Sequence, residues 1–392
     1  MKRVVAATEI ASPASRKKKA SVSTPGVSIV PDPDFSRDVI AWQKQHGRHA
    51  LPWQNTRDAY RVWLSEIMLQ QTQVAAVIPY YLRFLETFPS VADLAAAPSD
   101  QVMAHWSGLG YYSRARNLHR CAQIVMAEHG GRFSSDPEVL ETLPGIGRST
   151  AAAISAFSYG TRAAILDGNV KRVFARVFGI DRFPGEKAVE NEMWLRAVAL
   201  LPQQDVEAYT QGLMDLGATL CTRNRPSCER CPLAHRCVAY ATGRTAELPV
   251  RKPKKAVPER HAHMLVVVHE GEVLLQQRPE QGIWGGLLSL PEFAATPNTK
   301  SGEIPDLQSS IPELVTPFGE ASSIARLQVF SHGFTHFKLH VLPYRVDLSR
   351  RAYAVAQGDA LWYPIVGLAD APLPAPVKKL LLALFAAPDL LS

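Results

Sequence analysis

The sequence predicts a multi-domain protein, with an all-α domain followed by an α+β domain. At 392 residues the chain is long enough for two or three domains that each bury a core. From residue 34 to about residue 240, apolar residues recur at spacings of three and four, which is the period of amphipathic helices. After residue 260 the pattern changes to strand, tight turn and strand.

The first domain is assigned to residues 33–243. Gly and Pro separate its helical segments, and the alternation of β-branched residues that marks strands is rare. The expected helices span residues 60–77, 91–105, 115–129, 150–158 and 211–220.

The second domain is assigned to residues 261–390. Residues 263–278 are predicted to form two strands around a Glu-Gly turn, with further short strands at 337–346 and 361–363. Residues 377–387 are predicted to form a terminal amphipathic helix, because two lysines interrupt the apolar run.

Basic charge is concentrated in three segments, although the whole chain has a net charge of only +7. Residues 1–32 and 244–260 each carry six Lys or Arg, and residues 221–237 carry four Arg. This distribution favours contact with a polyanion. Residues 1–32 also have the composition of a disordered basic extension and residues 244–260 that of a basic Pro/Lys linker, so solvation alone explains the charge of these two segments equally well.

Four of the five cysteines lie within 17 residues, in a C-x6-C-x2-C-x5-C run formed by Cys221, Cys228, Cys231 and Cys237. Disulfide frameworks belong to small, cysteine-dense secreted domains, which this chain is not. Zinc ligands usually come in short C-x2–4-C pairs, and only Cys228 and Cys231 fit that spacing. The longer gaps favour an iron–sulfur cluster, with structural zinc as the alternative. The fifth cysteine, Cys121, is expected to be an ordinary buried thiol.

Two further motifs could carry chemistry. Gly145 and Gly147, in the turn Leu-Pro-Gly-Ile-Gly, could expose successive backbone N–H groups to a phosphate, although an ordinary helix–helix turn explains them as well. Asp167 follows an apolar run and opens the next helix, so it is a natural N-cap as well as a candidate catalytic carboxylate.

Together these motifs resemble those of the helix-hairpin-helix DNA glycosylase superfamily, and most closely its adenine-specific, MutY-type branch. The segments WLSEIMLQQTQV, GLGYYSRARNLH, LPGIGRSTA and LDGNVKR carry the resemblance, which extends over residues 34–385. It implies an all-α helix-hairpin-helix glycosylase domain with one 4Fe-4S cluster on the loop 221–237, followed by a Nudix-like domain.

The resemblance also implies catalytic residues. Glu66, among apolar neighbours on a predicted helix, corresponds to the acid that protonates adenine; without the resemblance it would be taken for a surface glutamate. Asp167 would stabilise the sugar cation and Asn169 would orient the pair, in a reaction that parallels glycoside hydrolysis. Ser149 stands where bifunctional relatives carry a nucleophilic lysine, so a monofunctional enzyme is expected; Lys171 is the nearest alternative amine.

Other positions are assigned by the resemblance alone. The expected adenine pocket is formed by Leu51, Trp53, Ser149 and Glu190, and the expected DNA contacts are Gln70, Gln71, Thr72, Tyr111, Gly145, Gly147 and Lys171. For the aromatic residues among them, packing in the core is the alternative.

The Nudix-like domain is expected to recognise 8-oxoguanine in DNA rather than to act as a Nudix hydrolase. Residues 288–293, directly after the glycine segment 282–287, contain one glutamate, Glu292, where a Nudix hydrolase needs several to hold magnesium. Phe334, Thr335 and His336 occupy the place of the loop that reads 8-oxoguanine, with threonine replacing serine. Three histidines at residues 332, 336 and 340 have a metal-like spacing, but we expect ordinary strand and loop side chains.

The leading hypothesis is therefore removal of adenine paired with 8-oxoguanine or G from duplex DNA. The alternatives are a pyrimidine or thymine-mismatch glycosylase of the endonuclease III type and a catalytically inactive iron–sulfur DNA-binding protein. We expect a monomer without membrane contact, since no apolar run is long enough to cross a bilayer. The expected location is the cytoplasm of a bacterium, at the nucleoid, with a targeting role for residues 1–30 left open.

Overall fold

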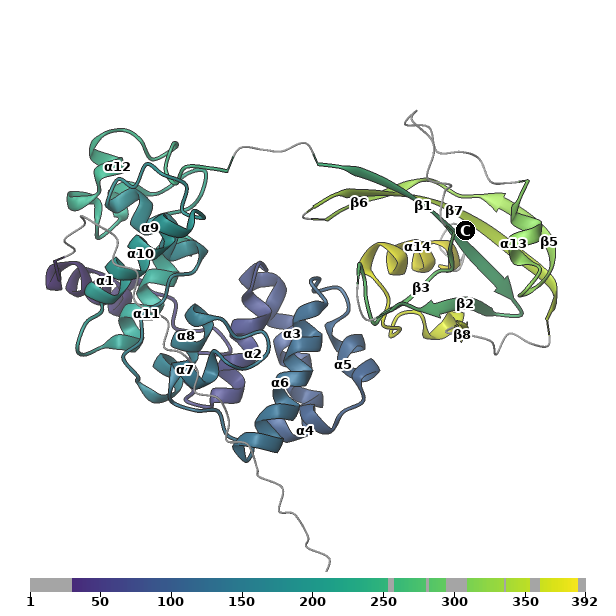
Figure 1. Cartoon of the computed structure of the whole chain (residues 1–392), viewed down its shortest axis with the longest axis horizontal. Helices are drawn as coiled ribbons and strands as arrows, with labels where there is room; N and C mark the ends of the chain where they lie inside the picture. Colours follow the sequence, from purple (N-terminus) through teal and green to yellow (C-terminus); the bar gives the residue numbers. More distant parts are fainter. Residues whose placement is uncertain are drawn as a thin grey trace, which may run out of the picture.

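The computed structural model describes residues 30–252, 257–279, 282–293, 309–334, 336–352 and 360–386. Helices form the first part of the chain and a sheet forms the second, as the sequence predicts (Figure 1). Among the described residues, no helix has the length and apolarity that crossing a membrane requires.

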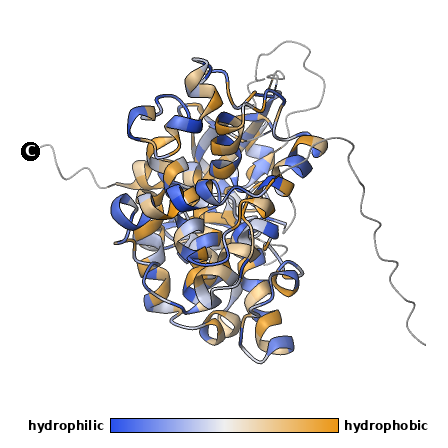
Figure 2. Cartoon of the chain, turned by 90° about the vertical axis from the view of Figure 1, so that its left-hand side faces the viewer, coloured by the Kyte–Doolittle hydropathy of each residue, from blue (hydrophilic) through white to orange (hydrophobic). Residues whose placement is uncertain are grey.

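Short helices build the first part. They are α1 (Pro33–His46), α2 (Ala59–Leu69), α3 (Val74–Thr87), α4 (Val91–Ala96), α5 (Ser99–Trp106), α6 (Ser113–His129), α7 (Pro137–Leu140), α8 (Arg148–Tyr159), α9 (Gly168–Val177), α10 (Lys187–Ala199), α11 (Val206–Asp215), the π-helix η1 (Leu216–Leu220), the 3-10 turns η2 (Cys228–Arg230) and η3 (Ala234–Arg236), and α12 (Val238–Ala241). Hydrophobic and hydrophilic residues are interspersed along these helices (Figure 2).

Side-chain caps explain where several helices begin. Asp32, Asp58, Asp136 and Asp167 each accept a hydrogen bond from a backbone N–H in the first turn of the helix that follows.

Two predicted helices are each divided in two. The segment 60–77 breaks at a turn in which Gln71 has a φ of 57°, and α3 begins after Gln73. The segment 91–105 breaks at Pro98, which is the N-cap of α5.

The helices enclose two cores. One contains the buried faces of α2 to α6, including Trp63, Phe84 and Trp106. The other joins α1 to α9, α10 and α11, around Phe35, Phe174 and Tyr209. Helix α2 thus belongs to the first core and α9 to the second.

The second part contains a mixed sheet. Its strands are β1 (Glu259–His269), β2 (Glu272–Gln277), β3 (Leu288–Ser289), β4 (Glu292–Phe293), β5 (Gly319–Arg326), β6 (Phe330–Gly333), β7 (Lys338–Arg351) and β8 (Ala360–Pro364), with helices α13 (Ile311–Val315) and α14 (Ala375–Phe385) and the 3-10 turn η4 (Ile365–Gly367). The strand order is β3-β2-β1-β7-β5, and the central β1–β7 pair is parallel.

Successive residues of β1 face opposite sides of this sheet. Met264 and Val266 join the core that continues into the helical part, whereas Leu265 and Val267 pack with α13. The two parts of the chain are also linked by a hydrogen bond from Ser107 Oγ to the carbonyl of Leu373, 2.9 Å long.

Gly212 should be required where α11 crosses α1. A methyl group there would lie 2.8 Å from Val39 Cγ1 and 3.2 Å from its carbonyl oxygen. Ala normally favours a helix over Gly by about 1 kcal/mol, but overpacking should reverse the sign. We predict that Gly212→Ala lowers the free energy of unfolding by about 1–3 kcal/mol, measured by denaturant titration.

Gly168→Ala is the matched control, since an added carbon there meets no atom within 4 Å. Equal or greater stability of Gly212→Ala would show that the helices do not approach as closely as described.

Candidate active site

A cavity of about 700 Å³ opens between the segment before α2 and helix α11. Leu51, Trp53 and Glu66, three residues predicted to bind or act on adenine, line it together. Trp53 is also an edge-to-face partner of Tyr81, with ring centroids 5.4 Å apart, so its role in packing and its place on the cavity wall coexist.

Glu66 is on α2, where Val62 and Leu69 also line the cavity. Burial and the nearby charge of Asp167 both disfavour the ionised carboxylate and raise the pKa of Glu66 to about 8. Glu66 therefore keeps its proton at neutral pH.

Asp167 is the N-cap of α9. Its Oδ1 accepts from the N–H of Val170 at 2.8 Å, and its Oδ2 accepts from Asn169 Nδ2 at 3.3 Å. Burial raises the pKa of Asp167, but these hydrogen bonds and the charge of Arg172 act in the opposite direction. The two carboxyl groups thus occupy different environments, and only that of Asp167 contains groups that favour ionisation.

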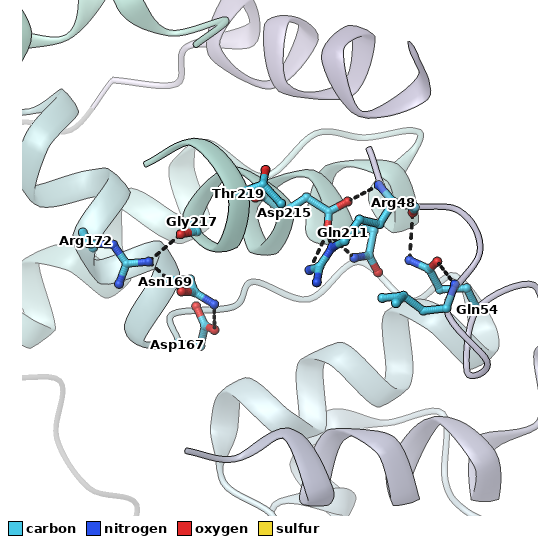
Figure 3. Close-up of polar contacts among 10 residues, drawn as sticks. Arg48, Gln54, Asp167, Asn169, Arg172, Gln211, Asp215, Gly217 and Thr219 are labelled. Atoms are coloured by element: carbon cyan, nitrogen blue, oxygen red, sulfur yellow. Dashed lines mark hydrogen bonds and ion pairs between the residues drawn. The ribbon is translucent and has the colours of Figure 1, made fainter. Parts of the chain in front are cut away.

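Asn169 connects Asp167 to the cysteine loop through Arg172 (Figure 3). Arg172 Nη2 donates to Asn169 Oδ1 at 2.7 Å and to the carbonyl of Gly217 at 2.6 Å, and its Nε donates to the carbonyl of Cys221 at 2.7 Å. Gly217 permits this approach, since a Cβ there would lie 2.4 Å from the Cβ of Asn169.

Asp215 organises the other side of the cavity (Figure 3). Its carboxylate is fully buried and accepts from the N–H of Arg48 at 2.8 Å, from Arg48 Nε at 2.7 Å and from Gln211 Nε2 at 2.8 Å. Arg48 and Gln211 both line the cavity, and their polar groups could orient a bound base.

Local sequence patterns did not predict these three residues. Arg48 and Asp215 are 167 positions apart, and no local motif marks either of them.

Ser149 and Glu190 lie elsewhere. They line a separate hollow of about 510 Å³ with Gln70 and Gly147, not the cavity that contains Glu66. Ser149 Oγ accepts a hydrogen bond from the N–H of Leu166 at 2.8 Å. The structure thus separates these two residues from the other two expected members of the adenine pocket.

Glu190 has a different partner from the one expected. It forms ion pairs with Lys171, at 2.7 Å, and with Lys187, at 3.7 Å. The two lysine ammonium groups hold the Glu190 carboxylate in place, and they lower its pKa.

Arg114 holds in place the turn at residues 70–72 and contacts Tyr111, which were both expected to contact DNA. Its guanidinium donates to the carbonyls of Ile67, Met68 and Gln70 and to Thr72 Oγ1, at 2.7–3.1 Å. The same group lies 5.4 Å from the ring centroid of Tyr111.

Tyr111 and Gln71 are both exposed and both have positive φ values, of 51° and 57°. Such backbone geometry is uncommon outside glycine and often marks functional turns.

The two hairpin glycines occupy a turn before α8. Gly145 has a φ of 79°, and Gly147 is the N-cap of α8 with no side-chain cap. The first N–H groups of α8 are thereby left free to meet an anion.

Cys221, Cys228, Cys231 and Cys237 are all free thiols and line one pocket. In the described parts of the chain, no three His, Cys, Asp or Glu are arranged to hold a single metal ion.

Arg176 supports this loop from beneath. It is buried and donates to the Sγ of Cys221 at 3.3 Å and to the carbonyls of Thr222 and Arg223. Of the four arginines in the loop, Arg236 is paired with Asp32 at 2.7 Å, whereas Arg223, Arg225 and Arg230 are exposed.

In the sheet domain, Phe334 follows β6 and its ring lies 5.6 Å from that of Trp284. His336 is exposed, and Thr335 lies outside the described residues. Glu292 forms an ion pair with Arg278 at 2.6 Å, so the one glutamate available after the glycine segment is already engaged.

Replacing Glu66 should alter how stability depends on pH. A carboxyl whose pKa is raised in the folded state binds a proton more tightly than in the unfolded chain, so its contribution to stability is lost as pH rises from about 4.5 to about 8. We predict that Glu66→Gln unfolds at nearly the same temperature as the unmodified protein at pH 5 and at a higher temperature at pH 8.5. A constant difference between the two proteins across this range would contradict the raised pKa.

Family models match both parts of the chain: "HhH-GPD superfamily base excision DNA repair protein" over residues 64–197 and "NUDIX domain" over residues 262–383. The chain is 35% identical over 348 residues to the adenine DNA glycosylase of Buchnera aphidicola (subsp. Schizaphis graminum), covering 88% of this chain and 97% of that protein. It is 34% identical over 400 residues to the adenine DNA glycosylase of Mus musculus, covering 88% of this chain and 76% of that protein. A solved thermostable thymine-DNA glycosylase is 28% identical with a TM-score of 0.48, covering 53% of this chain and 96% of that one. Because these two relatives are 34–35% identical to the chain and are matched over 76–97% of their own length, the chain belongs to the adenine DNA glycosylase family.

Proposed function

We propose that this protein removes adenine from duplex DNA, where it is paired with 8-oxoguanine or G, by hydrolysing the N-glycosidic bond without cutting the strand. The observation that carries the proposal is the pairing of two carboxyl groups in contrasting environments: Glu66 lines a cavity large enough for a flipped base, and Asp167 lies near enough for its charge to act on Glu66.

The protonated Glu66 is the general acid. It donates its proton to N7 of adenine, so the C1′–N9 bond breaks with both electrons going to the base. The carboxylate of Asp167 stabilises the positive charge that develops on the sugar. Glu66, now ionised, accepts a proton from water as the water oxygen bonds to C1′. The products are free adenine and an abasic sugar, and Glu66 has recovered its proton.

Asn169 and Arg172 keep Asp167 in place during this reaction. Asn169 Nδ2 donates to Asp167, and Arg172 holds the amide oxygen of Asn169, so the orientation of the amide is fixed. Arg48 and Gln211, held by Asp215, are suited to hydrogen bond with the edge of the adenine ring.

Two contacts support a monofunctional reaction. Ser149 carries a hydroxyl that is engaged by Leu166, and it offers no amine for a Schiff base. Lys171, the nearest alternative, has its amine engaged in an ion pair with Glu190 at 2.7 Å.

We further propose that the four cysteines hold one 4Fe-4S cluster. When bound, the cluster uses all four thiolates as ligands and supplies structural bracing rather than an open coordination site. The exposed Arg223, Arg225 and Arg230 would then be fixed for contact with DNA phosphates.

Asp167→Asn is the sharpest test of the mechanism. Asn is nearly as good an N-cap as Asp, so the variant should keep α9 and lose only the charge. We expect the single-turnover rate of adenine loss from an A:8-oxoguanine duplex to fall at least about a hundredfold. Thermal unfolding controls for the fold, and a rate within about threefold of the unmodified protein would refute the role of Asp167.

The same assay separates the alternatives. Base loss should occur in A:8-oxoguanine and A:G duplexes and not in T:G, U:G or C:G duplexes. Strands should break only after alkali. Breakage without alkali at the rate of base loss would contradict the monofunctional reaction.

A further inference from the structure

The first turn of α6 contacts two regions that are expected to bind DNA around the mismatch, the turn at residues 70–72 and Tyr111. Arg114, the second residue of this helix, fastens the turn at residues 70–72 and lies against Tyr111. Arg116, two positions later, points to the sheet domain instead and donates from Nη1 to the carbonyl of Gly285.

The contact of Arg116 is with a tightly folded loop. Gly285 is buried and follows Trp284, which has a φ of 55°. The guanidinium stem of Arg116 also packs against Gly286, where an added Cβ would lie 3.8 Å from Arg116 Cδ. Gln277 Nε2 donates to the carbonyl of Gly286 at 2.9 Å, so the loop is held from both sides.

The same loop supports the tip of β6. Trp284 is 6% exposed, and its ring centroid is 5.6 Å from that of Phe334 and 6.0 Å from that of His332. Phe334 in turn stacks on Phe337 at 4.6 Å. A displacement of residues 284–286 therefore moves the aromatic support beneath Phe334.

We propose that Arg116 is a positioning residue for recognition of the opposite base. It touches neither adenine nor the opposite base in this arrangement. It sets the distance between Tyr111, carried by the helical domain, and Phe334, carried by the sheet domain. The proposal rests on the proposed function, because it assumes that an opposite base lies between these two side chains.

Ser107 provides a matched control for the general stability of the domain contact. Its Oγ donates to the carbonyl of Leu373, so it too joins the two domains, but at α5 and the segment before α14 rather than at the loop under Phe334. Ser107→Ala should weaken the contact between the domains without changing the position of the loop.

The test compares discrimination, defined as the ratio of kcat/KM for A:8-oxoguanine duplexes to that for A:G duplexes. Arg116→Ala should lower this ratio by about three- to tenfold, the effect of one lost hydrogen bond, mainly by slowing the reaction on A:8-oxoguanine. Arg116→Lys, which can still donate one hydrogen bond, should recover part of the ratio. Ser107→Ala should leave the ratio unchanged even where it lowers the unfolding temperature.

Three results would overturn the proposal: an unchanged ratio in both Arg116 variants, an equal fall in the ratio in Ser107→Ala, or an unmodified protein that removes adenine equally well opposite 8-oxoguanine and G. If Arg116→Ala does not fold, Arg116→Lys alone tests the proposal. A ratio below that of the unmodified protein supports the proposal, and a ratio equal to it overturns the proposal. Failure of the proposed function looks different, because the unmodified protein would then release no adenine from either duplex.

Discussion

The proximity of the half-buried Glu66 to Asp167 is the interaction on which the rest of the site depends. A carboxyl group in water would be ionised at neutral pH and could not donate a proton to a purine. Burial on α2 and the nearby charge of Asp167 raise its pKa to about 8. Desolvation raises the pKa of Asp167 as well, but the Val170 N–H, Asn169 and Arg172 act in the opposite direction. The same functional group thus meets two different environments, and only that of Asp167 contains groups that favour its charged form.

Holding these two groups together requires contacts between distant parts of the chain. Glu66 belongs to a helix of one core and Asp167 begins a helix of the other. The segment from Gln211 to Cys221 joins them: Asp215 fixes Arg48 at the cavity, Gly217 packs on Asn169, and the carbonyl of Cys221 binds Arg172. The cysteine loop is thus continuous with the polypeptide that positions the catalytic carboxylate, and bracing of this loop would steady the site.

Local sequence patterns predicted the fold class, the turn between β1 and β2, and two of the helices that begin with an Asp cap, α2 and α9. They did not predict β5 and β6, which lack a clear alternation of apolar residues and have mostly exposed side chains. They also predicted α2 and α3 as a single helix, because the apolar spacing continues through the turn at Gln71. Only the backbone conformation of Gln71 breaks the helix.

Only those residues of the site that stand in a recognisable stretch of sequence could be predicted. Glu66, Asp167 and the four cysteines stand in recognisable segments, whereas Arg48, Gln211 and Asp215 acquire their roles from contacts between the start and the end of the helical domain. Glu190 was assigned to the adenine pocket by the resemblance alone, and its ion pairs with two lysines could not be foreseen without the spatial position of α10.

The central claim is that Glu66 acts as an acid while it is protonated. The most direct measurement is the single-turnover rate of adenine release from an A:8-oxoguanine duplex as a function of pH. The account predicts a rate that is nearly constant at neutral pH and falls about tenfold per pH unit above pH 8, as Glu66 ionises. A rate that stays constant or rises between pH 7 and pH 9.5 would contradict it.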